Sequence, residues 1–287
     1  TKDSIIFMNN WKKLSIILLW LGIWQITATF IHNPIMLVGP IEALQTLWGL
    51  LPSGDFWISV YQSFLRISIG FLTAFMIGLL LGSLAYHIPF VKELLEPPML
   101  FFKSVPVASF VILALIWAGS RNLSIFIAFI VVLPVIYVNT ISGLESTDQK
   151  LLEMAAIFRL PLWKRVRFIY LPALVPYLLS ACRTALGMSW KSGVAAEVIG
   201  LPDHSIGERL YLSKIYLETA DLFAWTLVII TISALFERIV LYLISRLCPP
   251  SADTLLKGES SRETADRSSV SHSGTDPFHD AFVPAVS

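Results

Sequence analysis

The amino-acid sequence predicts an all-α membrane protein with six transmembrane helices. Of its 287 residues, 55% are hydrophobic and only 14% are charged, whereas a soluble globular domain carries about 25% charged residues. A chain of this length has too little interior to bury so much apolar surface, so lipid is the expected solvent for much of it. Alternating segments of about ten residues, which are typical of membrane β-barrels, do not occur in the sequence.

Six apolar segments come close to the ~20 residues that a helix needs to cross a bilayer. They are Leu14–Ile31, Phe64–Tyr86, Met99–Ala118, Leu123–Ile141, Phe168–Trp190 and Phe223–Leu247. Lysines precede the first segment, as in a signal peptide, but no small-residue cleavage site follows, so we interpret it as a transmembrane helix. A tight turn is predicted at residues 119–122, and a short helix is expected between the fifth and sixth segments.

The lysines and arginines between the segments predict the orientation. With the N-terminus in the cytoplasm, 12 of them lie inside and 4 lie outside. The expected organisation is a cytoplasmic N-terminal segment at 1–13, a transmembrane domain at 14–247 and a cytoplasmic tail at 248–287. The tail is rich in Ser, Asp and Glu and poor in aliphatic residues, so we expect it to be disordered.

The loop between the fourth and fifth segments, at about residues 142–167, carries five basic residues. Within it, Asp148–Phe158 predicts a short amphipathic helix that Pro161 is expected to end. The predicted apolar side consists of Leu151, Leu152, Ala155 and Phe158. These residues alone leave two interpretations open: the loop fixes the topology, or its helix docks into a groove of another protein.

Charged side chains inside apolar segments are costly and usually face a cavity or a partner. Arg183, past the middle of the fifth segment, is a candidate for the pathway of an anionic solute, with a structural ion pair as the alternative. Arg66 and Lys103 lie near segment ends, where long side chains can reach the membrane surface.

Trp190, Lys191 and Glu197 are expected to begin the long outer loop. There they could line the solute pathway or brace the loop. Gly78 and Gly82 form a G-x-x-x-G pattern that predicts close helix packing, within one copy of the chain rather than between copies.

The sequence lacks the motifs of several enzyme classes. It has no G-x-x-x-x-G-K-[ST] phosphate-binding loop, and its five histidines show no metal-ligand spacing. Two cysteines, Cys182 and Cys248, form no redox or zinc pattern. We therefore expect no catalytic residue, metal or cofactor in this chain.

The loop resembles the "EAA" loop of ABC importer permeases, which reads E-A-A, three residues, G, nine residues, I, one residue, L-P. Glu153 takes the acidic position, and Ala155 takes the second alanine position. The later positions of the motif are matched by Ile169, Leu171 and Pro172. Two positions depart from the motif, because Met154 replaces the first alanine and Arg159 replaces the glycine. Leu160 and Pro161 follow within the same loop.

The resemblance extends over about residues 38–247, through stretches such as "SFLRISIGFLTAFMIGLLLGSLAY", "PPMLFFKSVPVASFVILALIWAG", "PVIYVNTISGL" and "ALGMSWKSGVAAEVIG". These are similar to the nitrate/sulfonate/taurine branch of the binding-protein-dependent permeases. The resemblance implies a type I importer fold in the inner membrane of a bacterium. It implies as partners a second permease copy, two ATPase subunits that carry ATP and magnesium, and a periplasmic or lipid-anchored solute-binding protein.

The resemblance also implies that the loop couples the permease to the ATPase subunits and that the solute is a small anion such as a sulfonate, taurine or nitrate. A thiamine-precursor-like heterocycle is an alternative solute. A rival from another class is a secondary transporter or channel that needs no ATPase. Its mark would be paired broken helices in two halves of the chain, which we do not find in the sequence.

Overall fold

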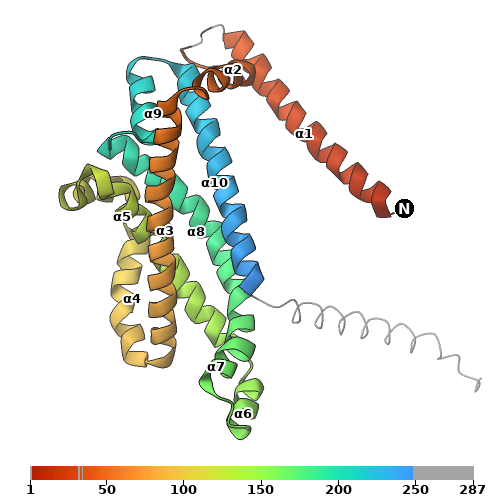
Figure 1. Ribbon diagram of the computed structural model, residues 1–287, viewed down its shortest axis with the longest axis vertical. Coiled ribbons are helices and arrows are strands. Elements are labelled where there is room, and N and C mark those ends of the chain that lie inside the picture. The colour runs from red at the N-terminus through yellow and green to blue at the C-terminus, as the bar shows by residue number, and fades with distance from the viewer. Residues whose placement is uncertain (1, 32, 34, 248–287) are drawn as a thin grey trace, which may run out of the picture. The chain divides into compact units, whose positions relative to one another are not determined.

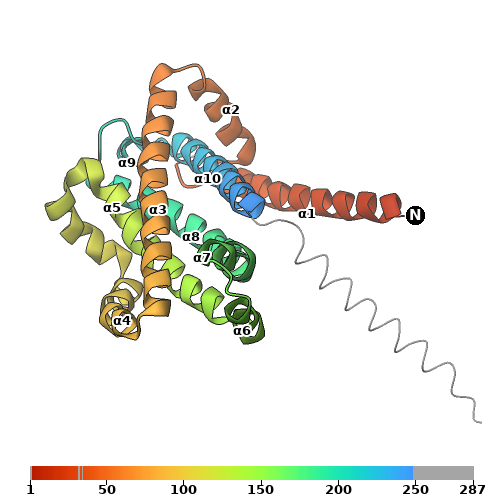
Figure 2. The same ribbon diagram turned by 60° about the horizontal axis from the view of Figure 1, so that its bottom comes forward.

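The computed structural model describes residues 2–31, 33 and 35–247, and this part of the chain is helical with no strand. Figures 1 and 2 show its arrangement. The helices are α1 Lys2–Ile31, α2 Pro40–Leu50, α3 Gly54–His87, α4 Pro89–Ser104, α5 Val107–Glu145, α6 Gln149–Ile157, α7 Leu162–Arg165, the π-helical η1 Val166–Tyr170, α8 Leu171–Gly200, α9 Ile206–Ile215 and α10 Thr219–Leu247. The all-α prediction is confirmed, and the predicted tail at 248–287 lies outside the described residues.

Four helical stretches of the described chain are long and apolar enough to cross a membrane: Gly54–His87, Val107–Glu145, Leu162–Gly200 and Thr219–Arg246. They contain the second, fourth, fifth and sixth predicted segments. The first predicted segment lies in α1, where Ser15–Ile31 forms a shorter apolar stretch. α1 itself continues without a break back to Lys2.

The third predicted segment is wrong as a single helix. Met99–Ala118 is interrupted at Val105 and Pro106, which have extended backbone angles between α4 and α5. Proline disfavours helical geometry in the residue before it, so α4 ends there and α5 begins anew. Pro106 is therefore the N-cap residue of α5, and Pro134 lies inside that helix.

Gly119 divides α5 into two limbs. Its φ of 68° and ψ of 166° interrupt the helical geometry, and this left-handed φ favours glycine. Val111 and Ala114 of the first limb belong to one buried cluster with Leu123 and Ile127 of the second. The predicted turn between two antiparallel helices is thus confirmed, with Gly119 as its pivot.

Small residues of α3 allow the second limb of α5 to approach closely. A Cβ atom added at Gly70 would lie 2.9 Å from the Ala128 Cβ, and one added at Gly82 would lie 2.7 Å from the Thr140 Cβ. Such distances leave no room for a side chain. The prediction that the glycines of this helix pack within one copy is confirmed.

The short helices of the chain lie at two opposite ends of the long ones (Figures 1 and 2). In both views α6 and α7 lie at one end, which we call the loop end, while α2 and α9 lie at the opposite end, which we call the α9 end (Figures 1 and 2). At the α9 end, Phe56, Ile206, Trp225 and Val228 form a buried cluster that joins α3, α9 and α10. The Phe56 and Trp225 rings stack with centroids 5.0 Å apart.

Candidate functional site

At the loop end, the short helix predicted at Asp148–Phe158 is present as α6. The Asp148 side chain caps it by accepting a hydrogen bond of 2.9 Å from the Lys150 N–H. The helix ends in a Schellman arrangement, because the Leu160 N–H donates to the Ala155 carbonyl at 2.9 Å and the Arg159 N–H to the Ala156 carbonyl at 3.1 Å. This turn ends α6, so the prediction that Pro161 ends it is wrong; Pro161 instead precedes α7 as its N-cap residue.

Arg159 occupies the left-handed position of this turn, with a φ of 49°. It is the position at which the EAA motif has glycine. Glycine adopts that φ without cost, whereas a residue with a Cβ loses about 1–2 kcal/mol there. The turn keeps its geometry although arginine replaces the glycine of the motif, and the backbone of Arg159 is strained as a result.

The apolar residues of α6 are only partly buried within the chain. Ala155 is 1% exposed and Leu152 is half-buried, but Phe158, predicted on the same side, is 72% exposed. Large apolar side chains at the loop end are exposed as a group, which we call the loop surface. It consists of Met154, Ile157, Phe158, Leu162 and Trp163.

The rest of the motif lies where the loop joins the membrane helix. Ile169 is buried in η1, and Leu171 and Pro172 begin α8. Proline has no N–H and its ring crowds the carbonyl four residues earlier, which is Phe168. The wider π-helical turn of η1 lies directly at this point, and helices commonly absorb such a misfit with a π-bulge.

At the α9 end, Trp190, Lys191 and Glu197 do not begin a loop, because α8 continues to Gly200. The chain leaves the helix only at Leu201, whose φ is 48°. Lys191 is exposed, whereas Trp190 and Glu197 are buried. Trp190 packs against Phe64 and Phe236 with ring centroids 6.2 and 6.3 Å apart.

Glu197 is the centre of a buried hydrogen-bond network. One of its carboxylate oxygens accepts bonds from the Ser63 hydroxyl at 2.6 Å and the Gly207 N–H at 3.3 Å. The same Ser63 oxygen accepts a bond of 2.8 Å from the Ile206 N–H. A Cβ added at Gly207 would overlap the Glu197 backbone and Cβ. The carboxylate therefore holds α3, α8 and the first turn of α9 together.

Arg66 is also buried, contrary to the expectation that it reaches the membrane surface. It is 9% exposed and donates hydrogen bonds to the Gln62 side chain at 2.8 Å and the Asp203 carbonyl at 3.3 Å. The helix begins at Gly54, ten residues before the predicted segment, so Arg66 lies deeper in it than the hydropathy pattern suggested.

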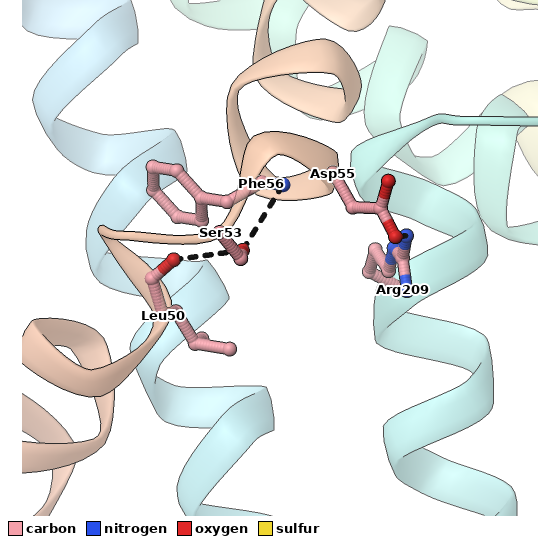
Figure 3. Close-up of polar contacts among 5 residues, drawn as sticks. All are labelled: Leu50, Ser53, Asp55, Phe56 and Arg209. Atoms are coloured by element: carbon pink, nitrogen blue, oxygen red, sulfur yellow. Dashed lines mark hydrogen bonds and ion pairs between the residues drawn. The ribbon is translucent and has the colours of Figure 1, made fainter.

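A second set of polar contacts links the first turn of α3 to α9 (Figure 3). The Ser53 hydroxyl accepts a bond from the Phe56 N–H at 3.3 Å and donates to the Leu50 carbonyl at 2.8 Å. Next to it, Arg209 approaches Asp55 at 3.5 Å. The predicted short helix between the last two spans is thus confirmed as α9, held by contacts from α3.

With both ends described, the chain can be compared with known proteins. Residues 74–248 match the family described as "Binding-protein-dependent transport system inner membrane component". The chain belongs to this family.

Members of the binding-protein-dependent transport family are ABC importer permeases with the type I fold, and they are membrane-embedded transport proteins rather than enzymes. The match includes the loop surface, the π-helical turn and the whole of α8. The first two helices and the start of α3 precede it.

Relatives of this permease include several proteins named for small anions. One is the aliphatic sulfonates transport permease SsuC of Bacillus subtilis, 27% identical over 77% of this chain and 80% of the relative. The nitrate import permease NrtB of Leptolyngbya laminosa is 28% identical over 62% of this chain and 67% of the relative. The bicarbonate transport system permease CmpB of Synechococcus elongatus is 27% identical over 82% and 91%. The chain therefore lies in the nitrate/sulfonate branch.

The structure separates the candidate residues of this permease into two groups. Glu153, Met154 and Arg159 are exposed on the loop, and Arg183 and Lys191 are exposed on α8.

The hydrogen bonds of Glu197 and Arg66 were missed, because their partners are 134 and 137 residues away in the sequence. The polar residues Gln62, Ser63 and Arg66, grouped around the start of the second predicted segment, were the local signal of such partners.

Proposed function

We propose that this permease conducts a small oxyanion across the membrane as one of two copies in an ATP-driven importer. In this proposal the loop surface docks onto a separate ATPase subunit, and a solute-binding protein delivers the anion at the α9 end. The N-terminus and the loop then face the cytoplasm of a bacterial cell, in agreement with the distribution of basic residues.

The observation that carries the proposal is the exposure of the loop surface. Ile157 is 78% and Phe158 72% exposed although both lie outside the membrane-spanning stretches, and Trp163 is 70% exposed at the very start of the stretch Leu162–Gly200. Groups of large, exposed apolar side chains outside the membrane mark sites of protein contact. Lys164 and Arg167 lie beside them, so an acidic rim on the partner would complement the patch.

The solute class follows from the relatives and from the charges on α8. Sulfonates, nitrate and bicarbonate share a compact, oxygen-rich negative group. Arg183 and Lys191 are exposed on the helix and are available to an anion in the assembled importer. The buried Glu197 and Trp190 brace the helix instead. A heterocyclic solute receives no comparable support.

Changing Ile157 to Asp tests the docking. A charge in the centre of an apolar interface should weaken binding of the ATPase subunit by at least about 30-fold, which corresponds to about 2 kcal/mol. The measurement is co-purification of the ATPase subunit with the tagged permease, together with ATP-dependent anion uptake into proteoliposomes.

The matched control is Ile215→Asp, which places the same charge at an exposed position of the α9 end. It should leave ATPase binding at the wild-type level. Wild-type co-purification and uptake in the Ile157→Asp complex would show that the loop does not couple to an ATPase. Anion uptake without any ATPase partner would favour the secondary transporter.

A further inference from the structure

A cavity of about 310 Å³ lies between α4 and the second limb of α5. Most of its wall is apolar, but Lys92, Glu96 and Lys103 of α4 and Tyr137 and Ser142 of α5 also line it. A volume of this size is at the lower end of the range for small-molecule sites, so it is ample for an ion of a few heavy atoms.

The helical repeat places the three charges of α4 on one face. Residues 92, 96 and 103 are separated by four and seven positions, which are one and two turns of an α-helix. Ser142 and Tyr137 lie five residues apart on the facing helix and add hydroxyl groups. The cavity thus has a mostly apolar wall, a charged stripe on α4 and two hydroxyl groups on α5.

The two lysines of this stripe differ in their partners. Lys92 donates a hydrogen bond of 2.8 Å to Glu145. That bond and the charge of Glu145 raise the pKa of Lys92, to which the charge of Glu96 also contributes. Lys92 is therefore held as one half of an ion pair, one helical turn from Glu96.

Lys103 lies two turns beyond Glu96, about 10 Å along the helix axis. Among the described residues it forms no ion pair and no hydrogen bond. An unpaired cation in a membrane protein is costly unless it faces water or a ligand. The carbonyl end of α4 offsets part of this cost, but it supplies no counter-ion.

We propose that the cavity between α4 and α5 is a binding site for the transported oxyanion, with Lys103 as its cation and the hydroxyls of Tyr137 and Ser142 as hydrogen-bond donors. This proposal rests on the proposed transport of a small anion and names where in the permease the anion is held. The wall of the cavity is mostly apolar, and among the described residues no carboxylate forms an ion pair with Lys103, so its exposed ammonium group is available to the solute.

The test uses thiol labelling in the full importer complex in membranes. A background is made with Cys182→Ala and Cys248→Ser that retains uptake, and Val138→Cys, at a lining residue to which the proposal gives no part in binding, reports on the cavity. The probes are a negatively charged and a positively charged methanethiosulfonate. The anionic reagent should react about tenfold faster than the cationic one, because a cation in a cleft raises the local concentration of anions. Nitrate or taurine should slow the reaction.

Adding Lys103→Gln should remove both the preference for the anionic reagent and the protection by nitrate or taurine, while Lys103→Arg restores them. The matched control Lys214→Gln removes an exposed cation at the α9 end and should change neither. A thiol at 138 that neither reagent reaches, or an anionic preference that persists in Lys103→Gln, would overturn the proposal.

The labelling result is independent of ATP. If Ile157→Asp shows that no ATPase couples to the loop while the Lys103-dependent preference remains, the importer proposal fails and the anion site stands. If coupling is confirmed and the preference is absent, the anion crosses elsewhere.

Discussion

Arg159 shows how a single residue can preserve a turn whose motif residue is missing. The hydrogen bonds from the Arg159 and Leu160 N–H groups back into α6 close the Schellman turn, and this geometry requires a left-handed residue between them. The turn sets the direction in which the chain leaves α6 towards α7. The chain keeps this turn at the expense of backbone strain at Arg159.

Replacing Arg159 with glycine should therefore stabilise the permease by about 1 kcal/mol. The unfolding temperature in detergent should rise by about 2–4 °C. The matched control is Arg165→Gly, at a position with helical angles (φ −61°, ψ −45°), where glycine should lower the temperature instead. Equal decreases in both variants would show that the left-handed turn is not strained.

Among the elements, α3 and the second limb of α5 are held together by a close approach of their backbones. Their contact is made by Gly70, Gly78 and Gly82 of α3, which face backbone and side-chain atoms of α5. Van der Waals packing of this kind drives helix association in lipid, where apolar surfaces gain nothing from leaving water. The same packing fixes the second limb of α5, and with it one wall of the anion cavity.

A methyl group added at Gly70 should disrupt this contact. Gly70→Ala should destabilise the permease by about 1–3 kcal/mol, because the added Cβ has no space. Gly187→Ala, in α8, is the control, since a Cβ there has no atom within 4 Å and should be neutral or stabilising by about 0.5–1 kcal/mol. Titration with denaturing detergent measures both. A neutral result for Gly70→Ala would mean that the helices are looser than described.

At the scale of the whole molecule, the two ends differ in how they are held. The α9 end is fixed by buried hydrogen bonds between helices far apart in the sequence, centred on Glu197. The loop end presents exposed apolar side chains and is held mainly by its own turn. This arrangement suits a permease whose loop receives its remaining contacts from another subunit.

Hydrogen exchange should reveal this difference. Glu197→Ala leaves the Ser63 hydroxyl and the Gly207 N–H without an acceptor, at about 1–3 kcal/mol for each buried group. Amides in the first turn of α9 should then exchange about tenfold faster or more, and amides of α6 should not change. Glu153→Ala, at an exposed site on α6, is the control and should leave α9 unaffected. Unchanged exchange in α9 would remove the bracing role of Glu197.

The sequence by itself determined the helical membrane class, the positions of most spans and the short helix in the loop at about residues 142–167. Each of these depends on local quantities: the apolar length needed to cross a bilayer, the helical period and the spacing of a motif. It also contained the signal for the break at Val105–Pro106, which the continuous hydropathy concealed.

Only the tertiary structure decided which charged side chains are buried and which of the others line a cavity. Arg66 and Glu197 owe their burial to partners more than a hundred residues away, and Lys103 faces a cavity made by two helices whose packing depends on a third. Hydropathy ranks each residue by its own polarity, whereas the free energy of a charge in a membrane protein depends on the groups that the fold brings to it.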